Sequence, residues 1–424
     1  MPVAMAKFGW LLGGILLAVM LFMNVHISIL LWRVRMHLGH GDTYTRLCKA
    51  AFAKAPPWQQ RLAATLTGVS QLVFFFALLG IYLISAGKAL ALIFNDAQVC
   101  LPVWMLMGAV IIAPFAGSSR TMGTYESLVW LNILTLLGSV FIPLGYMIIQ
   151  GTEETRPANS QFMAIEPITI PHTLTGLSLF TFGMTSQFML IEIIAEMKDP
   201  AELPKAYAGI SAPFQLGAFG LVGLGGYYYV GDAVQGMIIE SLPFGGALTA
   251  ACVCLVIHML ISYLIKGVVF CGSLQRFFDP AYASPTDTRK RSWLSWNVVV
   301  ISTAICAWLF ANLIPFFTEA VDLVGASVTP LSCWIIPIGM YLRCSWDCED
   351  DKLRIGFFEG VLLVIEIALA LVLMIFGSAS AMETIVAGWT TFGYPFACHC
   401  QLIWATCECS SDRIGMEYCN LTAT

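Results

Sequence analysis

Charged residues are scarce in this chain of 424 residues. Lys, Arg, Asp and Glu together make up 11% of it, whereas a soluble domain usually carries about 25%. The sequence also has no clustered basic patch, no Gly-Lys-Ser/Thr phosphate-binding loop and no His-Glu-x-x-His pair. These absences argue against an ordinary soluble domain. They also leave nucleic-acid binding, P-loop nucleotide hydrolysis and zinc-protease chemistry without support.

Apolar residues dominate instead, at 58% of the chain with a mean hydropathy of +0.80. They occur in blocks of about 20 residues, the length needed to cross a bilayer. We therefore predict an all-α polytopic membrane protein with one membrane domain over 1–377 and a Cys-rich segment over 378–424. The ten predicted spans are 11–33, 64–87, 100–117, 127–149, 172–195, 207–230, 244–270, 294–317, 323–342 and 355–377. A weaker apolar stretch near 385–406 could add one more membrane-associated segment.

The cysteines fall into two groups. Most of the 14 lie in or beside apolar runs, where Cys behaves as a small apolar residue. Those of the tail are clustered, at Cys398, Cys400, Cys407, Cys409 and Cys419. Disulfides or an irregular end of the gene model explain this cluster better than a metal site. We expect no metal ion and no cofactor.

Loop charges predict the orientation in the membrane, because cytosolic loops retain Lys and Arg. Seventeen of the 21 Lys and Arg residues belong to one set of alternate loops. The loops of this set are 34–63, 118–126, 196–206, 271–293 and 343–354, with a few of the cations at the adjoining span ends. These loops are predicted to face the cytosol, and 150–171 the opposite side. Lys88, at the far end of its span, is predicted to be an anchor that reaches the interface.

The span from about 172 is interrupted by polar residues at Gly183–Gln187, and the apolar pattern resumes at Phe188. Gly is a poor helix former, and Thr and Ser hydroxyls can satisfy freed backbone groups. Unwound backbone inside a membrane occurs where it lines a cavity or is buried in protein. Two readings remain open: a helix broken near mid-membrane, or a continuous helix whose hydroxyls bond the preceding turn.

Several stretches resemble one family. "FTFGMTSQFMLIEIIAEMKDPAELPKAY" is similar to the sixth helix and following loop of the amino acid/auxin permease family, within the amino acid–polyamine–organocation superfamily. "MPVAMAKFGWLLGGILL", "DTYTRLCKAAF", "GIYLISAGKAL" and "IPFFTEAVDLVGASVTPLSCWIIPIGMYL" resemble other segments of that family, in the same order. Arg46 departs from the pattern, which usually has an acid or Gly there. The resemblance covers about residues 1–377 and implies a LeuT-like fold of two inverted five-helix repeats.

The resemblance implies a substrate site at the break, formed by Phe182, Gly183, Met184, Thr185 and Ser186 together with Tyr82. In the family, a Gly-rich unwound segment of the first helix precedes the Leu-Pro-x-Ala that is Met1-Pro2-Val3-Ala4 here. That segment would supply amides for the substrate carboxylate and part of the ion site. We expect that the first half of helix 1 is missing from this sequence because the gene model is truncated.

Ionisable groups inside spans are candidates for ion coupling, because unpaired charge there is costly. Glu192, Glu196 and His258 are candidates for ion coupling or gating. The alternatives are loop anchoring by the glutamates, against Lys198 or Lys205, and a helix-to-helix hydrogen bond by the histidine. Glu366 is expected to be paired or to face another helix.

The resemblance implies a secondary active transporter of neutral amino acids, coupled to H⁺ or Na⁺, in the plasma membrane or the vacuolar or lysosomal membrane. Its partners would be an amino acid, the coupling ion and lipid. The alternative is a non-transporting amino acid sensor or an inactive truncated paralogue. The sequence has no catalytic carboxylate pair, metal-ligand spacing or nucleophile motif, so we do not expect an enzyme.

Overall fold

The computed structural model describes residues 1–95, 97, 99–121, 126–284, 286–314, 316–347, 353–392 and 395–396. All regular secondary structure in these ranges is helical. Ten helical segments there are long and apolar enough to cross a membrane. They correspond one to one with the ten predicted spans, and the all-α polytopic prediction is confirmed.

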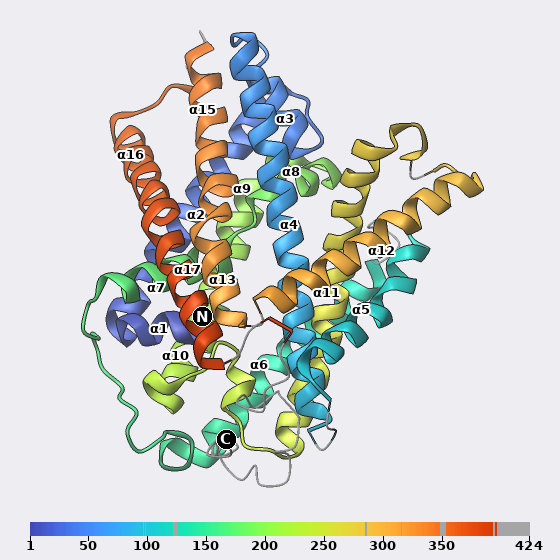
Figure 1. Cartoon of the computed structure of the whole chain (residues 1–424). Helices are drawn as coiled ribbons and strands as arrows, with labels where there is room; N and C mark the ends of the chain where they lie inside the picture. The colour runs from blue at the N-terminus through green and yellow to red at the C-terminus, as the bar shows by residue number, and fades with distance from the viewer. Residues whose placement is uncertain are drawn as a thin grey trace. The chain divides into compact units, whose positions relative to one another are not determined.

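Figure 1 shows the helices in chain order. The N-terminal set is α1 (Pro2–Phe8), α2 (Trp10–Leu38), α3 (Tyr44–Ala51), α4 (Pro57–Ile93), α5 (Leu101–Ser118), α6 (Glu126–Thr155), α7 (Ile170–Met184) and α8 (Gln187–Glu196). The C-terminal set is α9 (Leu203–Ala206), α10 (Ala212–Val230), α11 (Gly246–Phe278), α12 (Lys290–Leu313), α13 (Phe317–Ala326), α14 (Val328–Pro330), α15 (Ile336–Asp347), α16 (Phe357–Val372) and α17 (Ser378–Phe392). Short 3₁₀ and π turns join some of them, including η3 (Tyr207–Ser211), η5 (Ile238–Ser241), η7 (Leu331–Ile335) and η9 (Leu373–Gly377).

The chain divides into two compact units. The first comprises 1–74, 159–234 and 321–383; the second comprises 75–158, 235–320 and the chain from 384 onward. In the first unit, α1 packs on α2, α7 and α10, and α2 packs on α15. In the second, α11 runs along α6, and α12 packs on α5 and α11.

Glycines on α7 and α10 allow the short helix α1 to pack closely against both helices. A Cβ on Gly176 would collide with the Phe8 ring, one on Gly183 with the Met1 methyl group, and one on Gly223 would press on the Met5 side chain. Gly176 and Gly183 are seven residues apart and therefore share one face of α7. The missing side chains allow α1 to approach close to the C-terminal end of α7.

Lys88 corrects one prediction, since it is not an interfacial anchor. Its ammonium lies 3.2 Å from the Glu240 carboxylate, and both side chains are almost fully buried, at 4% and 3% exposed. Both residues belong to the second unit, where Glu240 is in η5 just before α11. A long apolar run continues past Lys88 to Ile93 in α4, so its ammonium is stabilised by a buried partner instead of by water.

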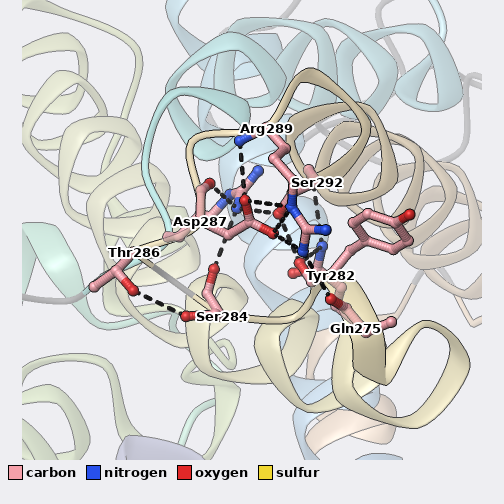
Figure 2. A network of polar contacts seen from close by, with 9 residues as sticks. Gln275, Tyr282, Ser284, Thr286, Asp287, Arg289 and Ser292 are labelled. Carbon is pink, nitrogen blue, oxygen red and sulfur yellow. Dashed lines mark hydrogen bonds and ion pairs between the residues drawn. The ribbon is translucent and has the colours of Figure 1, made fainter.

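The connection between α11 and α12 is held by Arg120, which follows α5. The Arg120 guanidinium lies 4.1 Å from the Trp293 ring centroid and donates to the Ser292 hydroxyl, at 2.7 Å, and to the Asp287 carbonyl, at 3.2 Å. Figure 2 shows the surrounding network, in which the Arg289 guanidinium reaches the Asp287 carboxylate at 2.6 Å. Hydrogen bonds from Arg289 lower the pKa of the Asp287 carboxyl to about 2. The carboxylate is therefore ionised at physiological pH and pairs with the Arg289 guanidinium.

This loop gives a direct test of the predicted orientation. Ser284 and Asn159 are both exposed, in segments predicted on opposite sides of the membrane. A membrane-impermeant maleimide applied to intact cells should label Asn159→Cys and leave Ser284→Cys unlabelled until the cells are opened, each compared with the unsubstituted chain. The reverse pattern would overturn the orientation drawn from Lys and Arg.

The C-terminal predictions are only partly within the described residues. After η9, α17 continues the last span as far as Phe392 and so takes up the first part of the weaker apolar stretch. The tail cysteines from Cys398 to Cys419 lie outside the described residues.

Candidate functional site

The span that starts near residue 172 is interrupted, as predicted. Helix α7 ends at Met184, and α8 begins at Gln187. Between them Thr185 is extended, with φ −70° and ψ 125°, and Ser186 has φ −138° and ψ −11°. The break is narrower than predicted, since Gly183 and Met184 belong to the last turn of α7. The continuous-helix reading is wrong.

Local hydrogen bonds explain why these residues interrupt the helix. The Thr185 hydroxyl donates to the Thr181 carbonyl at 2.6 Å, and the Thr185 amide donates to the Phe182 carbonyl at 3.3 Å. The Ser186 amide donates to the Gln187 side-chain carbonyl at 3.1 Å. Backbone groups that the break removes from the helical pattern are thus satisfied by neighbouring side chains and by one backbone carbonyl.

A buried polar network lies beside the break in the first unit. The Gln187 amide nitrogen donates to the Asn24 side-chain carbonyl and, at 3.2 Å, to the Ser28 hydroxyl. Asn24 donates to the Tyr207 hydroxyl at 3.0 Å, and Tyr207 is 2.5 Å from the Ser186 hydroxyl. The network therefore ties α2, the break at Ser186, the start of α8 and the start of η3 together through uncharged groups.

The sequence analysis missed Asn24, Ser28, Gln187 and Tyr207 as members of the site. A signal for two of them was present, because Asn24 and Ser28 are four residues apart on one face of an otherwise apolar span. Polar side chains inside a span usually face the protein interior. Both are buried here, at 2% and 1% exposed.

The predicted substrate-binding residues of the first unit differ in how exposed they are at the break. Gly183 is exposed, Phe182, Thr185 and Ser186 are half-buried, and the Met184 side chain is buried. Phe182 lies 6.3 Å from the Phe74 ring, centroid to centroid. Met184 can therefore offer a ligand its backbone, whereas the other four can also offer surface at the break.

Tyr82 belongs to the second unit, on α4. Its ring is half-buried, and the Lys266 ammonium lies 5.2 Å from the ring centroid. This contact places a cation over the face of the ring.

The three ion-coupling candidates have different surroundings. Glu192 accepts a hydrogen bond from the Tyr44 amide at 3.3 Å, at the N-terminus of α3, where the helix dipole favours a negative charge. Glu196 is exposed. His258, in the second unit, donates from Nδ1 to the Asn132 carbonyl at 3.2 Å and so joins α11 to α6. The expected alternative partner Lys205 pairs with Glu202 at 2.7 Å.

Metal binding has no visible site in the part of the chain that is described. Over those residues, no three His, Cys, Asp or Glu side chains are grouped as a metal ion would require.

Comparison with known proteins identifies a family for most of the chain. Residues 1–383 match the family model described as "Transmembrane amino acid transporter protein". The amino acid transporter AVT3B of Arabidopsis thaliana is 24% identical over 374 residues, which cover 86% of this chain and 85% of that protein. Amino acid transporter AVT1H of the same plant is 22% identical over 180 residues, 41% of this chain and 39% of that protein.

The fold is similar to that of a solved structure. The crystal structure of MhsT in complex with L-phenylalanine matches with a TM-score of 0.58 at 13% identity, and the match covers 90% of this chain and 93% of that one. This likeness confirms the LeuT-like fold. Taken with the match over residues 1–383, it shows that the chain is an integral, multi-pass membrane protein and belongs to the transmembrane amino acid transporter family.

Proposed function

We propose that the chain is a secondary active transporter that moves neutral amino acids by alternating access. The observation that carries the proposal is the interruption of the α7–α8 span at Thr185 and Ser186. Transporters of this kind use discontinuous helices to point helix ends at a substrate near mid-membrane. A span that only filled the membrane would have no reason to break within a polar network.

The ends of the two half-helices suit a zwitterion. The last carbonyls of a helix have no partner within it, and they carry the negative end of the helix dipole. The Thr181 and Phe182 carbonyls are already taken by Thr185, which leaves those of Gly183 and Met184 to receive an ammonium group. The first amides of α8 favour a carboxylate in turn.

The groups around the break support a neutral substrate side chain. The network of Asn24, Ser28, Gln187, Ser186 and Tyr207 carries no formal charge. Phe182 would supply aromatic surface for an apolar side chain at the break, and Tyr82 stays a candidate on the family resemblance alone. The solved MhsT complex contains L-phenylalanine, a neutral amino acid, which is consistent with this chemistry.

For the coupling ion we propose H⁺, with Na⁺ as the alternative outcome. In this fold, a sodium site usually recruits adjacent hydroxyls from the helix that corresponds to α11. The middle of α11, "CVCLVIHMLIS", offers His258 and no adjacent Ser/Thr pair. Glu192, Glu196 and His258 remain our candidates for ion coupling or gating.

Uptake into proteoliposomes tests the function. Purified protein should accumulate radiolabelled neutral amino acids such as phenylalanine, leucine or alanine when the lumen is alkaline relative to the medium, and should leave lysine and glutamate outside. Replacing sodium with choline at constant pH should not change this. Uptake that disappears in choline would assign Na⁺ instead. No uptake of any amino acid, with retained binding, would favour the sensor.

A further inference from the structure

A ladder of ionisable side chains joins α2 to α16 inside the first unit. The His26 Nδ1 and the Glu366 carboxylate are 2.8 Å apart, and the Arg33 guanidinium lies 2.8 Å from the Glu359 carboxylate. His26 and Arg33 are seven residues apart on α2, and Glu359 and Glu366 are seven apart on α16. His26 and Arg33 therefore lie on one face of α2, and Glu359 and Glu366 lie on one face of α16. On each helix the two residues are about 10 Å apart along the axis. Because α2 and α16 run antiparallel, His26 can pair with Glu366 while Arg33 pairs with Glu359. We call these two pairs the rungs of the ladder.

The two rungs are connected to each other. The Glu359 carboxylate oxygen that binds Arg33 also accepts from the Tyr341 hydroxyl at 3.2 Å and lies 4.0 Å from His26 Nε2. That last gap is longer than a hydrogen bond, and one bridging water or a small side-chain rotation would close it. A proton could thus pass between Glu366 and Glu359 through the two nitrogens of one imidazole ring.

Exposure rises along the ladder. The Glu366 side chain is 0% exposed, His26 is 16%, Glu359 is 19% and Arg33 is 40%. Arg33 and Glu359 lie near the ends of α2 and α16 that adjoin the loops predicted to be cytosolic, 34–63 and 343–354. Glu366 is thus the buried end of the ladder. Arg33 is the exposed end, on the side predicted to face the cytosol.

The charges of the ladder do not balance unless it holds a proton. With a neutral His26, two carboxylates face the single cation Arg33, so one negative charge remains inside a membrane protein. In addition, one Glu366 oxygen is buried without a hydrogen-bond partner among the described residues. An uncompensated buried charge is costly, and a single proton on His26 or Glu366 removes it.

Among the described residues, the ionisable groups that act on the Glu366 carboxyl are His26 and Glu359. On α16 the remaining acid is Glu359; α2 contributes His26 and Arg33, and α15 contributes Tyr341. Of the turns packed on α16, η9 has no ionisable side chain, and η7 has Cys333, whose thiol is hydrogen-bonded to Thr185 in the break and to the backbone of Phe188 in α8.

We propose that His26 and Glu366 together hold one exchangeable proton, which reaches the cytosol by way of Glu359, and that this proton drives transport. The inference rests on the proposed transport function and names its coupling site. One proton from water binds to the Glu366–His26 pair, which makes the ladder neutral, and the same proton returns to water at the Arg33 end. No other bond forms or breaks.

The test compares two transport modes in proteoliposomes. Glu366→Gln keeps the size and hydrogen bonding of the side chain but cannot take up a proton. It should lose accumulation driven by a pH gradient at least about tenfold, because the gradient no longer biases the equilibrium between states. Exchange of labelled for unlabelled substrate at equal pH should persist, which also shows that the variant folds. His26→Gln and the double variant should behave like Glu366→Gln, as expected for residues that act as a unit.

A matched control and a readout without transport complete the test. Glu383→Gln removes an exposed carboxylate from α17, and both transport modes should be unchanged. Purified Glu366→Gln protein should take up about one proton fewer per chain than wild type on acidification in weak buffer. Gradient-driven accumulation that survives in Glu366→Gln would overturn the proposal. Absence of both modes in the wild type would instead overturn the transport function, and the proton count would still test the site.

Discussion

A chain that carries Gly183→Val is expected to reach the membrane and to lose amino acid uptake by at least about tenfold, because a β-branched side chain would occupy space that backbone and ligand need. Gly183 is in the last turn of α7, directly before the break, and its surface is exposed. A Cβ there collides with the Met1 methyl group. The added side chain would therefore fill the approach to the Gly183 and Met184 carbonyls, which we propose receive the substrate ammonium.

Two other substitutions separate this effect from the general effect of replacing a glycine within a helix. The Met1 methyl is the end of a flexible side chain, so Gly183→Ala should lose less uptake than Gly183→Val. Gly217 in α10 has open space where a Cβ would stand, and Gly217→Val should leave uptake within about twofold, since exchanging Gly for Val changes helix propensity by less than ~1 kcal/mol, in favour of the helix. Uptake of labelled substrate measures transport, and surface biotinylation measures how much protein reaches the membrane. Full uptake by Gly183→Val would show that the substrate does not bind at this end of α7.

The break illustrates what the sequence alone could predict. Gly, Thr, Ser and Gln within an apolar run indicated an interruption, because they combine poor helix propensity with side chains that can bond the backbone. The sequence did not reveal that only Thr185 and Ser186 leave the helix. That depends on which carbonyl the Thr185 hydroxyl reaches. It also depends on Gln187, which is held by Asn24 from 163 residues away.

The partners of buried charges could not be predicted from the sequence either, because they lie far away along the chain. An ionisable residue in an apolar run, such as Glu366, shows that a partner is needed, and the structure supplies His26 from 340 residues away. Lys88 was misjudged because its span seemed to end beside it, whereas α4 continues to Ile93. Its partner Glu240 belongs to a short turn between spans, which no periodicity marks.

Lys88→Met should destabilise the protein by about 3–5 kcal/mol, the cost of leaving one member of a buried ion pair without the other. The substitution preserves most of the apolar stem, so the lost packing is small, and the Glu240 carboxylate is left buried without its cation. The transition midpoint on heating or in denaturant, followed by tryptophan fluorescence of detergent-solubilised protein, should fall accordingly.

The partner substitution shows whether the buried charge is the cause. Removing the acid as well, in Lys88→Met with Glu240→Leu, should recover most of the lost stability, because an apolar pair of similar volume often replaces a buried ion pair without cost. Lys205→Met breaks an ion pair that is shorter, at 2.7 Å, but exposed, and should change stability little since water screens such pairs. If Lys88→Met were as mild as Lys205→Met, or if the double variant were less stable than Lys88→Met, the stranded carboxylate would not be what destabilises the single variant.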